Sequence, residues 1–68
     1  MKYIERSTDN KYCRELSVYT SKDNYSLIYV KETQKLEISI EYGEKPTINR
    51  VLPTMSIADI LWLINGGK

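Results

Sequence analysis

Residues 56–66 read Ser-Ile-Ala-Asp-Ile-Leu-Trp-Leu-Ile-Asn-Gly, and they follow a chain that is otherwise rich in strand patterns. Ser56 is a favourable helix N-cap, and Asp59 suits the positive end of the first turn. Gly66 is a typical left-handed residue at a helix end. We therefore predict one helix over Ile57–Asn65.

The predicted helix carries more apolar surface than one small sheet can cover. On a wheel of about 100° per residue, four side chains form one stripe: Ile57, Ile60, Leu61 and Ile64. We expect this stripe to face the core, which leaves Leu63 on the flank and Trp62 about 140° away, toward solvent. The sequence therefore predicts a homodimer that associates through Trp62 and Leu63 of the C-terminal helix. The alternative is that residues 3 and 4 fold over Trp62.

The segments before the helix have strand patterns. Residues 12–20 alternate, with Leu16 and Val18 on one face. The other predicted strands are residues 2–6, 25–31, 36–42 and 47–52, the last closed by Pro53. Short connections favour neighbouring antiparallel strands. We predict an α+β fold in a single domain, residues 1–68: an antiparallel meander of four to five strands with one C-terminal helix packed on one face.

The pairing of the two central strands decides which face carries the tyrosines. If a five-residue loop pairs Val30 with Leu36, the helix covers Ile28, Val30, Leu36, Ile38 and Ile40. The opposite face then carries the predicted partner-binding residues, which are Tyr19, Tyr25, Leu27, Tyr29, Glu37 and Glu41. Tyrosine is enriched at interfaces, although cross-strand packing also explains it. A slip of one residue would reverse the two faces.

Composition favours a protein partner over nucleic acid. Ten basic and nine acidic residues give a net charge of +1, whereas nucleic-acid-binding domains are usually clearly basic. The chain has no histidine and one cysteine, which excludes an ordinary catalytic triad, the common zinc sites and an internal disulfide. We expect Cys13 to be a small hydrophobic residue near a strand start. The sequence therefore predicts no enzyme activity, no cofactor and no metal site.

Features related to location predict a cytoplasmic protein. No stretch is long and apolar enough to span a membrane, and the first residues lack the apolar run of a signal peptide. A lone cysteine is typical of a reducing compartment. The chain starts with methionine and has the features expected of a complete small gene product.

Three functions follow from these patterns. The first is a small non-catalytic protein-binding module, an accessory or inhibitor protein that occupies a surface of a larger protein target. Phage-encoded or mobile-element modulators of host proteins, including anti-defence proteins, are of this kind. The second is a single-stranded nucleic-acid-binding homodimer, because the strand order and terminal helix are similar to those of coactivator-type single-stranded DNA binders. That resemblance implies base stacking on sheet tyrosines. The third is a structural subunit of a homo-oligomer.

Overall fold

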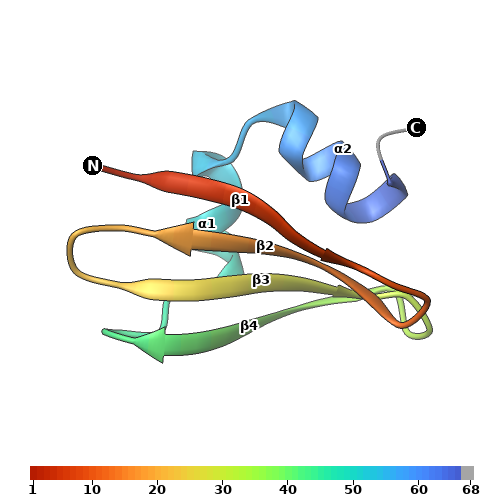
Figure 1. The fold of residues 1–68 in the computed structure, drawn as a ribbon, viewed down its shortest axis with the longest axis horizontal. Coiled ribbons are helices and arrows are strands. Elements are labelled where there is room, and N and C mark those ends of the chain that lie inside the picture. The colour runs from red at the N-terminus through yellow and green to blue at the C-terminus, as the bar shows by residue number, and fades with distance from the viewer. Residues whose placement is uncertain (67–68) are drawn as a thin grey trace.

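The computed structural model describes residues 1–66 (Figure 1). Its elements are β1 (Tyr3–Asp9), β2 (Cys13–Tyr19), β3 (Asn24–Val30), β4 (Lys35–Tyr42), α1 (Ile48–Val51), the 3-10 turn η1 (Leu52–Thr54) and α2 (Ile57–Asn65). The strands pair in the order β1-β2-β3-β4, and every pair is antiparallel. The predicted α+β class, a meander followed by a C-terminal helix, is confirmed.

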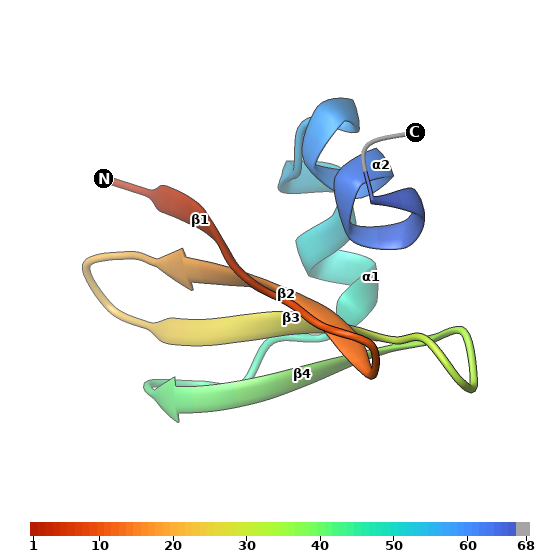
Figure 2. The ribbon, with the colours of Figure 1, turned by 45° about the vertical axis from the view of Figure 1, so that its right-hand side comes forward.

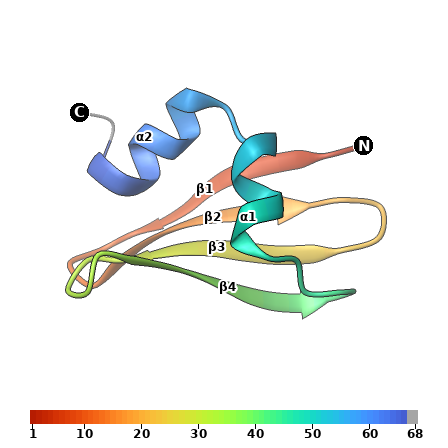
Figure 3. The same cartoon turned by 180° about the vertical axis from the view of Figure 1, so that it is seen from behind.

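Both helices lie on the same side of the sheet (Figure 2). Seen from behind, α1 crosses the strands and α2 lies toward the β1 side of the molecule (Figure 3). We call this surface of the sheet the helix side, and the opposite surface the open face. Within residues 1–66, neither α1 nor α2 is long and apolar enough to cross a membrane.

The first hairpin is longer than the sequence predicts. β1 runs to Asp9 instead of ending at residue 6, and its pairing with β2 continues past a bulge between Arg6 and Thr8. The turn itself is held by Asn10, whose Oδ1 accepts the N–H groups of Tyr12 at 2.8 Å and of Cys13 at 3.0 Å. Asparagine is favoured in turns because its side chain satisfies nearby backbone donors in this way.

The predicted strand over residues 47–52 is wrong, since this segment forms α1 and η1. Its apolar residues have helical spacing, at Ile48, Val51, Leu52 and Met55. Val51 and Met55 are buried in the core, so tertiary packing outweighs the β-propensity of the segment. Pro53 lies in the first turn of η1, where its missing N–H needs no partner.

The predicted register between β3 and β4 is also wrong, by one residue. Val30 pairs with Lys35, and Leu27 pairs with Ile38. The connection is therefore a turn of four residues instead of five. It closes with the N–H of Gln34 donating to the carbonyl oxygen of Val30 at 2.8 Å, and Gln34 adopts the left-handed region at φ 58°. No glycine marks this position in the sequence.

The register exchanges the two faces of β3. Tyr25, Leu27 and Tyr29 lie on the helix side, while Ile28 and Val30 lie on the open face. The buried apolar residues form one core between the sheet and the helices: Leu16, Val18, Tyr25, Leu27, Ile38, Val51, Met55 and Leu63. The predicted placement of Leu16 and Val18 on the core side of β2 is confirmed, since both are fully buried.

Candidate functional site

The six predicted partner-binding residues do not form one surface. Tyr19 and Glu37 lie on the open face, whereas Tyr25, Leu27 and Tyr29 lie on the helix side, with Tyr25 and Leu27 in the core. Glu41 is exposed, and it has no partner on β3 because Tyr25 pairs with Ile40 and Asn24 with Tyr42. The tyrosine surface expected from the sequence is therefore not present.

The open face has a polar, partly acidic centre. Ser17, Ser26 and Ser39 form a row across three strands. In the neighbouring row, Glu15 and Glu37 flank Ile28. The row at one end includes the rings of Tyr3 and Tyr19, whose centroids are 5.8 Å apart. Carboxylates in the middle of this face repel a polyanionic ligand and so disfavour its binding here.

The apolar stripe of α2 faces away from the sheet, opposite to the prediction. Three of its four residues are exposed, namely Ile57 (76%), Leu61 (46%) and Ile64 (38%), and we call these three the α2 stripe. Leu63, predicted to lie on the outer flank, is fully buried at 0%. A surface helix ordinarily buries its apolar stripe against its own core. Here only Ile60, the fourth residue of the predicted stripe, packs against the core, and Ile57, Leu61 and Ile64 stay exposed within residues 1–66.

Arg6 of β1 contacts the side of α2 opposite the stripe. Its Nε lies 3.4 Å from Oδ1 of Asp59, and its guanidinium carbon lies 5.5 Å from the centroid of the Trp62 ring. Asp59 and Trp62 are half-buried, and both are on the side of α2 opposite the stripe. The ion pair and the cation–π contact therefore hold the polar and aromatic side of the helix against β1.

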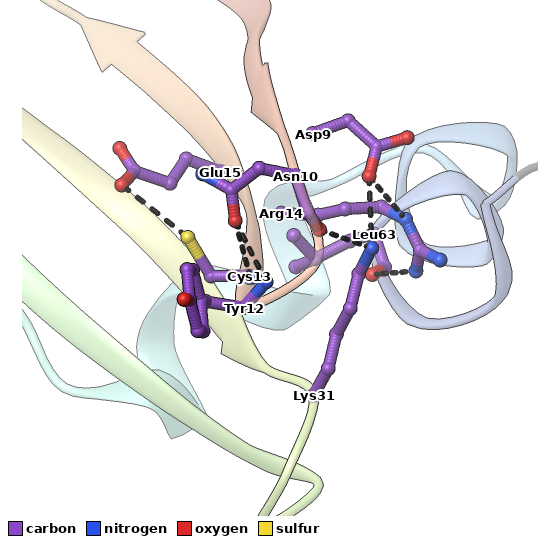
Figure 4. Close-up of polar contacts among 8 residues, drawn as sticks. All are labelled: Asp9, Asn10, Tyr12, Cys13, Arg14, Glu15, Lys31 and Leu63. Atoms are coloured by element: carbon purple, nitrogen blue, oxygen red, sulfur yellow. Dashed lines mark hydrogen bonds and ion pairs between the residues drawn. The ribbon is translucent and has the colours of Figure 1, made fainter.

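Arg14 of β2 contacts the last turn of the same helix. Its Nη1 donates to the carbonyl oxygen of Leu63 at 3.0 Å, and its Nε lies 3.3 Å from Oδ1 of Asp9 (Figure 4). Lys31 reaches the same Asp9 oxygen at 3.0 Å. The hydrogen bond from Lys31 and the positive charges of Lys31 and Arg14 lower the pKa of the Asp9 carboxyl below its usual 3.8. A cation at the last turn of a helix also complements the helix dipole.

Both predicted ends of α2 are confirmed. The Oγ of Ser56 accepts the N–H of Asp59 at 3.1 Å. Gly66 takes the left-handed conformation at φ 71°, and its N–H points at the carbonyl oxygens of Leu61 and Trp62. A Cβ at position 66 would also lie 3.0 Å from Nη2 of Arg14, so glycine suits both the turn and the close approach of the guanidinium.

The residues predicted for self-association are not placed to carry it. Leu63 offers no surface to a second chain, and Trp62 is covered in part by Arg6. Self-association through α2 stays a prediction, and the α2 stripe would carry it in place of Trp62 and Leu63. Sequence reasoning identified the stripe but put it on the wrong side. The missed signal is the position of Arg6 and Arg14 on the strands that receive the helix.

The described residues offer little for chemistry. Within residues 1–66, no group of three or more His, Cys, Asp and Glu side chains could hold a metal ion. Cys13 is half-buried on the open face, with its Sγ 3.9 Å from Oε1 of Glu15. The α2 stripe is therefore the candidate functional site, and its chemistry is apolar contact.

A comparison of the chain with known protein families, with curated proteins and with solved structures finds no match.

Proposed function

We propose that this protein is a small, non-catalytic protein-binding module that docks on a larger target through the α2 stripe. The observation that supports it is the outward orientation of Ile57, Leu61 and Ile64. Large aliphatic side chains that gather on one exposed helix face mark interaction surfaces. Apart from its caps, α2 has polar residues only at Asp59 and Asn65, so the stripe itself carries no charge.

The spacing of the stripe suggests how the target binds. Ile57, Leu61 and Ile64 stand at positions i, i+4 and i+7 of α2. These are the anchor positions of a helix that lies in an apolar groove. We therefore propose that the target presents a groove lined by apolar side chains, and that the module acts by occupying it.

A foreign groove is favoured over a symmetric pair of α2 helices. A helix of nine residues is about 13 Å long, and two such stripes laid together bury far less than the roughly 1,000 Å² expected of a stable interface. A groove encloses the stripe on several sides and also reaches the neighbouring half-buried Ile60. Most of the binding energy would then come from a few central aliphatic anchors.

The biological role that we propose is that of an accessory or inhibitor protein, of the kind that phages and mobile elements use to modulate host proteins. Blocking a groove on a target protein requires no catalytic group. The proposed compartment is the cytoplasm, because the single Cys13 is a free thiol.

The experiment is a quantitative affinity capture from the cells that carry the gene, using the full chain and two double variants. Ile57→Ser with Leu61→Ser removes two anchors from the α2 stripe. Tyr3→Ser with Tyr42→Ser removes two exposed aromatic side chains from the sheet and serves as the matched control. Circular dichroism establishes that each variant folds.

We expect one protein to be captured by the wild type and the tyrosine variant, with at least a tenfold loss in the α2 variant, as truncation of two hot-spot anchors predicts. Equal capture by all three chains would contradict the proposed site. Loss only in the tyrosine variant would move the binding surface to the sheet.

A further inference from the structure

We propose that two copies of this chain associate through the outer edge of β4, as antiparallel strands with Ile38 on the two-fold axis. β4 is the last strand in the sheet, so its outer backbone groups have no strand partner within residues 1–66. The strand has eight residues and no proline. A long open edge of this kind is a template for pairing with another strand.

The other edge of the sheet differs from β4. β1 has its bulge in the middle of the strand, between Arg6 and Thr8, whereas the bulge in β4 lies near the end of the strand, at Glu41. The chain around the β1 bulge is also tied to the helical layer. Lys2 donates from Nζ to Oγ1 of Thr54 at 2.6 Å, and Arg6 pairs with Asp59. Bulges and covering elements protect an edge strand from pairing. This protection leaves β4 as the edge suited to a second copy.

Of the three registers centred on Glu37, Ile38 and Ser39, the sequence of β4 is complementary to itself only in the one centred on Ile38. With Ile38 on the axis, Leu36 lies opposite Ile40 of the second copy, and Lys35 lies opposite Glu41. With the axis at Glu37, the two Glu37 side chains would oppose each other. With the axis at Ser39, Glu37 would oppose Glu41. Like charges directly opposite each other destabilise a strand pair, whereas opposite charges stabilise it.

The bulge in β4 is compatible with this register. Glu41 is the residue without a partner on β3, so regular pairing with a second copy covers residues 36–40 and ends where the bulge begins. Lys35 and Glu41 are exposed, and neither forms an ion pair within residues 1–66. Both side chains are therefore available at the two ends of the new strand pair.

Apolar surface also reaches this edge. Ile40 is 36% exposed, and a hollow on the helix side of β4 is lined in part by Leu36, Ile38, Pro46 and Ile48. In the proposed dimer, Leu36 of the second copy covers Ile40. α2 packs on β2 and β3, away from the new interface (Figure 3). The dimer would leave both α2 stripes exposed, so this inference does not depend on the proposed function.

The test is a charge-reversal cycle, read by sedimentation velocity over a series of concentrations. The chains are the wild type, Lys35→Glu, Glu41→Lys and an equimolar mixture of these two variants. Lys11→Glu is the control, because it changes net charge as much as Lys35→Glu in the exposed β1–β2 turn, a hairpin that β3 separates from β4. In the mixture, each 35–41 contact again joins a lysine to a glutamate.

We expect a wild-type dimer, a dissociation constant about tenfold or more higher for each single variant, and recovery in the mixture. The control should match the wild type. A second readout uses a Cys13→Ser background, in which a Glu37→Cys chain should form a disulfide with a Ser39→Cys chain, and neither should cross-link alone. A wild-type monomer at every concentration would overturn the proposal. The proposal would also be overturned by a dimer whose dissociation constant is unchanged in the charge-reversal variants and which is lost in Ile57→Ser with Leu61→Ser. That result would place self-association at α2.

Discussion

Arg14 donates a hydrogen bond of 3.0 Å to the carbonyl oxygen of Leu63, and this contact joins the start of β2 to the last turn of α2. It fixes which side of the helix faces the core. With Arg6 holding Asp59 and Trp62, it turns Ile57, Leu61 and Ile64 outward. The candidate site therefore depends on two arginines that do not belong to it.

Replacing Arg14 with alanine should lower the free energy of unfolding by about 1–3 kcal/mol, because it removes a hydrogen bond from a charged donor and the ion pair with Asp9. Urea denaturation measures this change. Arg50→Ala is the control, since Arg50 is exposed on α1, and its effect should stay within about 0.5 kcal/mol. Equal losses in the two variants would mean that Arg14 does not anchor the helix.

The orientation of α2 has its own test in the pair Leu63→Ala and Leu61→Ala. Leu63 is fully buried and Leu61 is 46% exposed. We expect Leu63→Ala to cost about 2–5 kcal/mol, as for buried leucines in general, and Leu61→Ala to cost less than about 1 kcal/mol. Thermal or urea unfolding distinguishes the two. The reverse order would restore the orientation predicted from the wheel.

Local signals predicted the ends of α2 correctly, since Ser56 and Gly66 act through their nearest backbone groups. They could not predict its rotation. Val51 of α1 and Met55, which follows η1, both lie in the core, although this segment has a strand pattern in the sequence. With that space filled, α2 buries Leu63 fully, while Ile60 and Trp62 pack against the core and stay partly exposed.

The strands were predictable in number and direction, but the tyrosine surface was not. β3 is apolar on both faces, so side-chain patterns do not distinguish two registers one residue apart. The turn decides instead. Gln34 adopts a left-handed conformation, which a sequence usually signals by glycine or asparagine. The β3–β4 turn therefore closes one residue earlier than the sequence predicts.

Asp9 should make stability depend on acid pH. Its pKa is lowered in the folded protein, chiefly by the hydrogen bond from Lys31, so the folded state binds the proton less readily than the unfolded state. The resulting stabilisation is present above the ordinary value of 3.8 and is lost as the pH falls through the lowered pKa. Melting temperatures of wild type and Asp9→Asn should therefore converge toward low pH. Glu32→Gln, in the exposed β3–β4 turn, is the control and should run parallel to wild type.

The alternative of single-stranded nucleic-acid binding can be tested directly with an oligonucleotide. Glu15 and Glu37 lie in the middle of the open face, whereas Tyr25 and Tyr29 lie on the helix side of the sheet. We therefore expect no binding of oligo-dT in fluorescence anisotropy at low salt, where phosphate contacts are strongest. Tight binding that weakens steeply with added salt would revive a single-stranded nucleic-acid function.

The most direct test of the central claim is site-specific photocrosslinking with a benzophenone amino acid in cells that carry the gene. One chain carries it at Ile57, which is 76% exposed on the α2 stripe, and the control carries it at Ser39 on the open face. We predict a crosslink from position 57 to one larger protein, and from position 39 none to any protein other than a second copy of the chain. A crosslink to a larger protein from position 39 alone, or from neither position, would contradict docking through α2.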